Sequence, residues 1–162
     1  MAINKAKKAD VVEKLTDAFK KAASVVFVNF KGLTVGNTTD LRRTLKSEGV
    51  SYSVAKKTLT RRALDTQKFK GNAPELPGEF ALAWGEDLVA PAREVYIFQK
   101  KFPENLKILG GVFEGRYMSK VEMEGIAMIP AVPVLRGMFV NIINSPIQRF
   151  AIALNEIAKI KV

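Results

Sequence analysis

The stretch SVVFVNF, residues 24–30, constrains the fold of this chain more than any other segment. It is a continuous run of β-branched and aromatic residues, which is typical of a strand that is buried on both faces. A strand of this kind needs a covering layer on each side of its sheet, and helices supply such layers in α/β proteins. We therefore expect a sheet with helices packed against it.

Helical and strand patterns alternate along the first 130 residues. We expect helices over 5–22, between Gly32 and Gly49, and over 56–67, 87–102 and 119–129, and strands over 24–30, 50–54 and 80–84. Residues 106–118 should form a strand that is broken at Gly110–Gly111 and followed by a turn at Glu114–Gly115. Asn37 and Thr38 are candidate N-caps for the second helix, and Ser119 with Glu122 has capping-box spacing. The order predicts an α/β fold over residues 1–130, an α+β layered sandwich in which helices cover a mixed sheet.

Residues 131–162 are expected to form a helical extension. A short apolar helix, VLRGMFVNIIN, should end near Pro146, and a long amphipathic helix should follow it. Large apolar residues line one side of the last helix and alanines flank them, so the apolar arc covers about half of the circumference, more than an ordinary surface helix shows. Packing on its own domain, a membrane surface and another protein are the three alternatives. The polar face is hardly basic, which disfavours a membrane, and another protein is favoured over intramolecular packing.

The composition disfavours an enzyme, a metal site or a cofactor. The chain has no cysteine and no histidine, so it lacks thiolate ligands, the commonest metal ligand and the usual general base. No P-loop or nucleophile-elbow motif is present, and Glu122 and Glu124, two residues apart on a helix, do not face each other. No apolar run reaches the ~18 residues of a membrane span, and the first residues lack a signal core. We expect a non-enzymatic, soluble, cytoplasmic protein.

The positive charge is concentrated in residues 1–71, which hold 16 of the 26 Lys and Arg residues but only 6 of the 16 Asp and Glu residues. Lys56 and Lys57 begin a helix, where acids are preferred, and Arg61 follows Lys57 by one turn. A bound phosphate would offset both the unfavourable interaction of the lysines with the helix dipole and the repulsion between Lys57 and Arg61. A solvated basic face is the alternative. The candidate RNA-binding residues are Lys5, Lys7, Lys8, Lys31, Arg42, Arg43, Lys56, Lys57, Thr58, Arg61 and Arg62. The strand aromatics Phe27, Phe30 and Tyr52 are assigned to the core, so base stacking is not expected.

Three stretches resemble one family in colinear order. They are LTVGNTTDLRRTLKSEGVSYSVAKKTLTRRAL, APAREVYIFQKKFPENLKILGGVFEGRYMS and NIINSPIQRFAIALNEIAKIKV, and they are similar to the bacterial large-subunit ribosomal protein L10 family, the anchor of the acidic ribosomal stalk. The resemblance implies a structural constituent of the large ribosomal subunit. Its α/β domain would bind ribosomal RNA at the stalk base beside ribosomal protein L11, through residues that include Arg42, Lys56, Thr58 and Leu59.

The resemblance also implies that the last helix receives dimers of the acidic stalk protein (L7/L12), which recruit translational GTPases. The docking residues would be Ile147, Phe150, Ala151, Leu154, Ile157, Ala158 and Ile160. Because the helix is short, we expect two dimers, on PIQRFAIAL and NEIAKIKV. Lys57 stands where the family usually has Asn, and Pro77–Gly78–Glu79 stands where it often has Gly-Pro. The alternative hypothesis is a regulatory protein that binds messenger RNA.

Overall fold

The computed structural model describes residues 5–67, 69–74 and 77–160, and it divides the chain into two compact units. The first unit is Met1–Ile129 and the second is Pro130–Val162.

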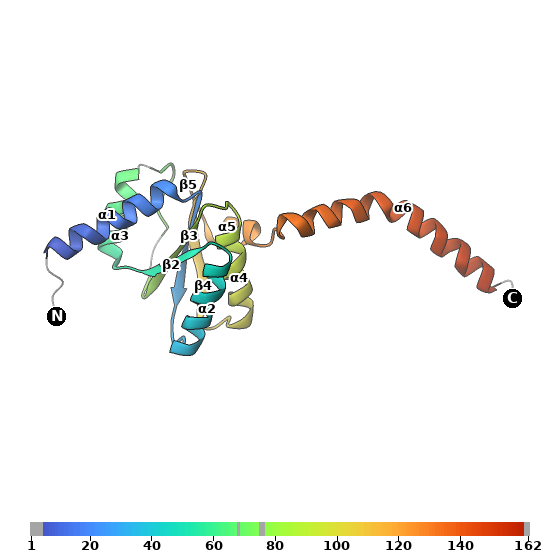
Figure 1. The fold of residues 1–162 in the computed structure, drawn as a ribbon, viewed down its shortest axis with the longest axis horizontal. Coiled ribbons are helices and arrows are strands. Elements are labelled where there is room, and N and C mark those ends of the chain that lie inside the picture. The colour runs from blue at the N-terminus through green and yellow to red at the C-terminus, as the bar shows by residue number, and fades with distance from the viewer. Residues whose placement is uncertain (1–4, 68, 75–76, 161–162) are drawn as a thin grey trace. The chain divides into compact units, whose positions relative to one another are not determined.

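The first unit is built on a five-stranded sheet in the order β2-β3-β1-β4-β5 (Figure 1). The strands are β1 (Ser24–Phe30), β2 (Ser51–Val54), β3 (Phe80–Gly85), β4 (Leu106–Phe113) and β5 (Arg116–Met118). The α/β layered class is confirmed. All the strand pairs of this sheet are antiparallel, so the prediction of a mixed sheet is wrong. The physical reason is visible at β2, where Val54 at the strand's end pairs with Ala81 at the start of β3. Helix α3 and the loop after it return the chain to the end of the sheet that it left.

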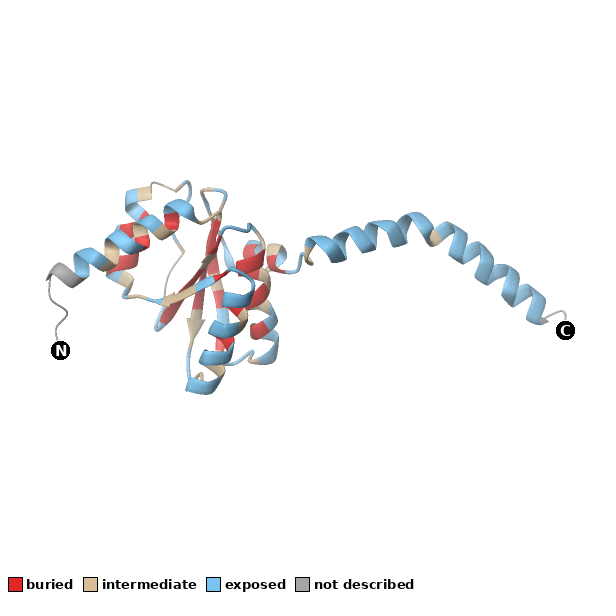
Figure 2. Cartoon of the chain, in the orientation of Figure 1, coloured by how far each residue is buried: buried red, intermediate tan, exposed pale blue. Residues whose placement is uncertain are grey.

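Helices cover both faces of this sheet, as the burial of β1 requires (Figure 2). Helices α1 (Lys5–Lys21) and α3 (Lys57–Gln67) pack on the face that carries Val25 and Phe27. Helices α2 (Val35–Ser47), α4 (Ala90–Lys101) and α5 (Lys120–Ala127) pack on the opposite face, which carries Val26 and Val28. All four of these strand residues are buried, which confirms the expectation for residues 24–30.

Two helix starts show how the local sequence sets the element boundaries. Helix α2 is capped by Thr34, whose side chain accepts a hydrogen bond from the Asn37 N–H at 3.3 Å. The expected caps Asn37 and Thr38 are therefore wrong, because an extended hydroxyl residue one turn earlier already satisfies that donor. At α5 the capping box of Ser119 and Glu122 is confirmed. Hydrogen bonds from the backbone and the hydroxyl of Ser119 lower the pKa of Glu122.

The second unit contains one long helix, α6 (Val132–Ile160), instead of the two helices that we expected on either side of Pro146. A proline inside a helix removes one hydrogen bond, here the bond to the Ile142 carbonyl, and bends the helix without having to end it. Figure 1 shows a bend within α6. Among the described residues, no single helix is long and apolar enough to cross a membrane, and only α5 and α6 taken together across the break between them pass that test.

Candidate RNA interface and apolar helix

The first turn of α3 presents cations beside the N–H groups of Lys57 and Thr58, which donate no hydrogen bond within the described residues. Leu59 and Thr60 are buried, and their N–H groups each donate to the Lys56 carbonyl at 3.0 Å, which fixes the start of the helix. Lys56 and Thr58 are exposed and Lys57 is half-buried. The first turn contains no acid, so the partial positive charge of the helix start adds to that of the two lysines. This arrangement suits a phosphate group.

Five of the predicted basic residues border three separate hollows rather than one surface. Lys56 and Lys57 line a hollow of ≈390 Å³ with Phe30 and Glu79. Lys8 and Arg62 line a groove of ≈660 Å³ between α1 and α3, which has Val12 and Leu59 among its apolar residues. Arg42 lines a third hollow, of ≈310 Å³, with Lys46, Tyr52 and Trp84. The structure therefore brings the cations together in small groups.

The division follows from the layers of the fold. Helices α1 and α3 lie on one face of the sheet and α2 lies on the other, so Arg42 and Arg43 are on the opposite face from Arg61 and Arg62. Strand β2 pairs only with β3 and forms the sheet edge between them. Lys31 is exposed directly after β1, and its backbone is held by two hydrogen bonds to Asn105. The side chains of Lys5 and Lys7 lie outside the described residues.

The candidate cations are free of acidic partners where the structure describes them. The five ion pairs among the described residues join other groups. The cations that take part in none of them are Lys8, Lys31, Arg42, Arg43, Lys56, Lys57, Arg61 and Arg62. Clustered cations that are only solvated bring the protein no gain in free energy. When such cations bind a polyanion, the counterions condensed on the polyanion are released, and this release favours binding.

Arg42 also contacts an aromatic ring at the sheet edge. Its guanidinium carbon lies 5.7 Å from the centroid of the Tyr52 ring, which is cation–π distance. Burial raises the pKa of Tyr52 to about 12, and the charge of Arg42 lowers it by less. The phenol therefore stays protonated at neutral pH. Sequence analysis did not select Lys46 or Trp84, although Lys46 follows Arg42 by one helical turn on the same basic helix.

Helix α6 exposes large apolar side chains along its whole described length. Ile147, Phe150, Leu154 and Ile157 are 69%, 67%, 52% and 54% exposed, and Ala151 and Ala158 are exposed as well. The side chain of Ile160 lies outside the described residues. The residues before Pro146, which sequence analysis did not select, are equally exposed, with Phe139 at 65% and Ile142 at 70%. The mostly apolar stretch VLRGMFVNII, which only Arg136 and Asn141 interrupt with polar side chains, was the signal that could have identified them.

Comparisons with known proteins identify the family. A family model described as Ribosomal protein L10 matches residues 3–100, which include α1 to β3 and most of α4. The chain is 38% identical over 149 residues to the large ribosomal subunit protein uL10 of Gluconobacter oxydans (strain 621H), which covers 92% of this chain and 80% of that protein. It is 36% identical over 155 residues to the uL10 protein of Staphylococcus carnosus (strain TM300), with 95% and 93% covered. The chain belongs to the ribosomal protein L10 family.

Proposed function

We propose that this chain is a structural, non-enzymatic constituent of the large ribosomal subunit, in which the first unit binds large-subunit ribosomal RNA at the stalk base and α6 docks dimers of the acidic stalk protein. The relatives named above are large ribosomal subunit proteins. The observation that carries the docking role is the row of large apolar side chains exposed along both halves of α6.

The RNA-binding role of the first unit rests on the free cations. Lys56, Lys57 and Thr58 surround the start of α3, where backbone N–H groups complete an anion site. Arg61 lies one turn further along, and Arg62 and Arg42 add separate positive groups on the two faces of the sheet. Contacts of this kind with the phosphate backbone of RNA position a protein without reading the base sequence. The protein would lie beside ribosomal protein L11 in the subunit.

The docking role of α6 rests on energetics and charge. An exposed helix with this much apolar surface is marginal alone in water, and burial of each large apolar side chain stabilises a complex by roughly 1.5–3 kcal/mol. Of the described charged residues on α6, Glu156 is paired with Lys159 at 2.9 Å. Arg136 and Arg149 form no ion pair within the described part of the chain. Their charge complements an acidic partner.

Pro146 divides this docking surface into two segments. The segments 132–145 and 147–160 are each long enough for about four helical turns. Each carries its own set of exposed large apolar residues. Two dimers would therefore bind on opposite sides of the proline, rather than both on the residues after it. Docked dimers would recruit translational GTPases.

Sedimentation of ribosomal particles tests the proposed function. A tagged copy of the chain should move with the large subunit in a density gradient, and the acidic stalk protein should move with it. A variant that lacks residues 132–162 should still move with the large subunit but without the acidic protein. A tagged chain that stays at the top of the gradient, or that is bound to messenger RNA instead, would contradict the proposal.

A further inference from the structure

Trp84, the only tryptophan of the chain, is half-buried in a strand whose other residues, Phe80–Ala83 and Gly85, are all buried. It packs with the apolar cluster under α1 on one side. It lies opposite Ser51 of β2, the edge strand of the sheet. The large indole therefore reaches the surface at an edge where no further strand covers it among the described residues.

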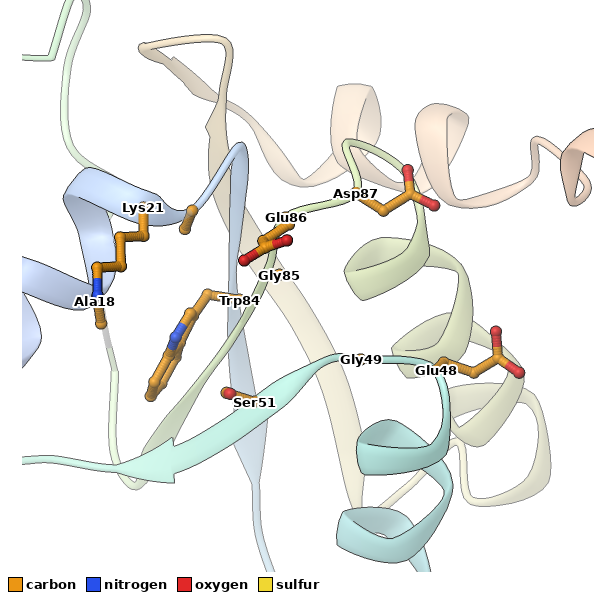
Figure 3. Close-up of a pocket in the computed structure, with 10 residues that line it drawn as sticks. Ala18, Lys21, Glu48, Gly49, Ser51, Trp84, Gly85, Glu86 and Asp87 are labelled. Atoms are coloured by element: carbon orange, nitrogen blue, oxygen red, sulfur yellow. The ribbon is translucent and has the colours of Figure 1, made fainter.

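The indole borders two adjoining hollows that share Ser51. The first, of ≈410 Å³, is also lined by Ala18 and Lys21 of α1, and Figure 3 shows the indole lying between α1 and β2. The second, of ≈310 Å³, is lined by Arg42, Lys46 and Tyr52. Binding pockets for small ligands begin at about 300 Å³, so the first hollow has room for one flat ring.

Cations line both hollows beside Trp84, with Lys21 in the first and Arg42 and Lys46 in the second. Arg42, Lys46 and Lys21 form no ion pair among the described residues. Three carboxylates also line the first hollow, but Glu48 pairs with Arg93 at 3.7 Å, and Figure 3 shows Glu48 and Asp87 directed away from the indole. Glu86 is the carboxylate on the indole side, where it can accept hydrogen bonds from the N–H groups of a base.

We propose that Trp84 is a stacking platform for one unpaired RNA base, which enters the first hollow while Arg42 and Lys46 hold the phosphates next to it across the β2 edge. The inference rests on the proposed RNA-binding function and adds a contact that backbone binding does not require. An aromatic face beside free cations is the arrangement that binds single-stranded nucleic acids. It differs from the expectation drawn from the sequence, which considered Phe27, Phe30 and Tyr52 and assigned them to the core.

Because Trp84 is the only tryptophan, its fluorescence reports the proposed contact directly. The full chain is titrated with a twelve-residue oligoadenylate, and tryptophan emission and the anisotropy of end-labelled oligonucleotide are followed in parallel. Stacking predicts quenching that saturates together with the anisotropy. Inorganic polyphosphate, which has the charge but no bases, should compete for binding without quenching.

Two substitutions at one position separate stacking from packing. Trp84→Leu keeps an apolar side chain in the cluster but has no flat π face, and should weaken oligoadenylate binding about tenfold. Trp84→Phe keeps a face and should bind within about threefold of the original chain. Neither should change the slope of log affinity against log salt, whereas Arg42→Gln should reduce it by about 0.7. Thermal unfolding of each variant verifies that it is folded.

The outcomes distinguish this inference from the proposed function. Binding of oligoadenylate and of large-subunit ribosomal RNA with unchanged emission would overturn the stacking contact and leave RNA binding intact. Equal affinities of the Leu and Phe variants would also overturn it. Failure of the original chain to bind either RNA would overturn both proposals.

Discussion

Arg42 of α2 lies over the ring of Tyr52 on the edge strand, with its guanidinium carbon 5.7 Å from the ring centroid. This contact joins a helix on one face of the sheet to the strand that forms its edge. It holds one of the proposed RNA-binding cations beside the hollow that Trp84 borders.

Alkaline pH should destabilise the first unit through Tyr52. Burial raises the pKa of Tyr52 in the folded protein to about 12, above the ordinary value of about 10 that holds in the unfolded chain. As pH rises, the unfolded chain therefore releases the Tyr52 proton before the folded chain does. The contribution of Tyr52 to the free energy of unfolding is fully present below pH ~10 and is lost as pH rises towards ~12. Urea unfolding between pH 9 and 11.5 should show a smaller loss for Tyr52→Phe. If the free energy of unfolding falls equally steeply with pH in the original chain and in Tyr52→Phe, Tyr52 is not buried as described.

Removal of the positive charge at the start of α3 should weaken RNA binding. With Lys56, Lys57 and Arg61 changed to Gln, the slope of log affinity against log salt should fall by about 0.7–0.9 for each phosphate that the protein no longer neutralises. The matched control changes Lys100, Lys101 and Lys107, three exposed lysines outside the basic first 71 residues. The same measurement on both variants should show a much smaller change for the control. An equal change would mean that binding depends on net charge alone.

The capping box of α5 should make a measurable contribution to stability. Ser119→Ala removes the acceptor for the Glu122 N–H and should lower the free energy of unfolding by about 1 kcal/mol. Ser119→Thr keeps the hydroxyl and should lose much less. Urea unfolding of the three proteins at neutral pH compares them. If Ser119→Ala and Ser119→Thr lower the free energy of unfolding by the same amount, the side-chain cap does not stabilise the helix.

Charge substitutions on α6 should separate its two docking segments. Phe139→Asp and Phe150→Asp place a carboxylate at exposed apolar positions on opposite sides of Pro146, and each should remove one stalk dimer. The controls Asn141→Asp and Asn155→Asp add the same charge where the side chain is already polar and should retain both dimers. Pull-down of the acidic protein with each variant measures the ratio. Loss of both dimers from either Phe variant would indicate one continuous binding site.

The sequence predicts those features that depend on local side-chain chemistry. The apolar run of 24–30 predicts a strand buried on both faces, and the Ser119 and Glu122 spacing predicts a capping box, because burial pattern and cap geometry are set within a few residues. The direction of β3 could not be predicted in this way. It depends on where α3 and the loop before Phe80 return the chain, and alternation of elements is compatible with either direction.

The prediction at Pro146 was wrong and Trp84 was not selected, and both have the same physical origin, the surrounding structure. Pro146 has the sequence signature of a helix end, yet α6 continues through it, because the loss of one N–H donor can bend a helix without ending it. Trp84 could not be recognised as a binding residue from the strand pattern alone, since a core strand also favours aromatic residues. Its exposure results from the position of β3 beside a short edge strand, which only the assembled sheet shows.

Native mass spectrometry of the chain purified together with its acidic partner tests most directly whether α6 is a rod for two stalk dimers. We expect one complex of one chain with four copies of the acidic protein, falling to two copies in Phe139→Asp and in Phe150→Asp. A chain that carries no acidic protein under conditions that preserve the partner's own dimers would contradict the docking role of α6.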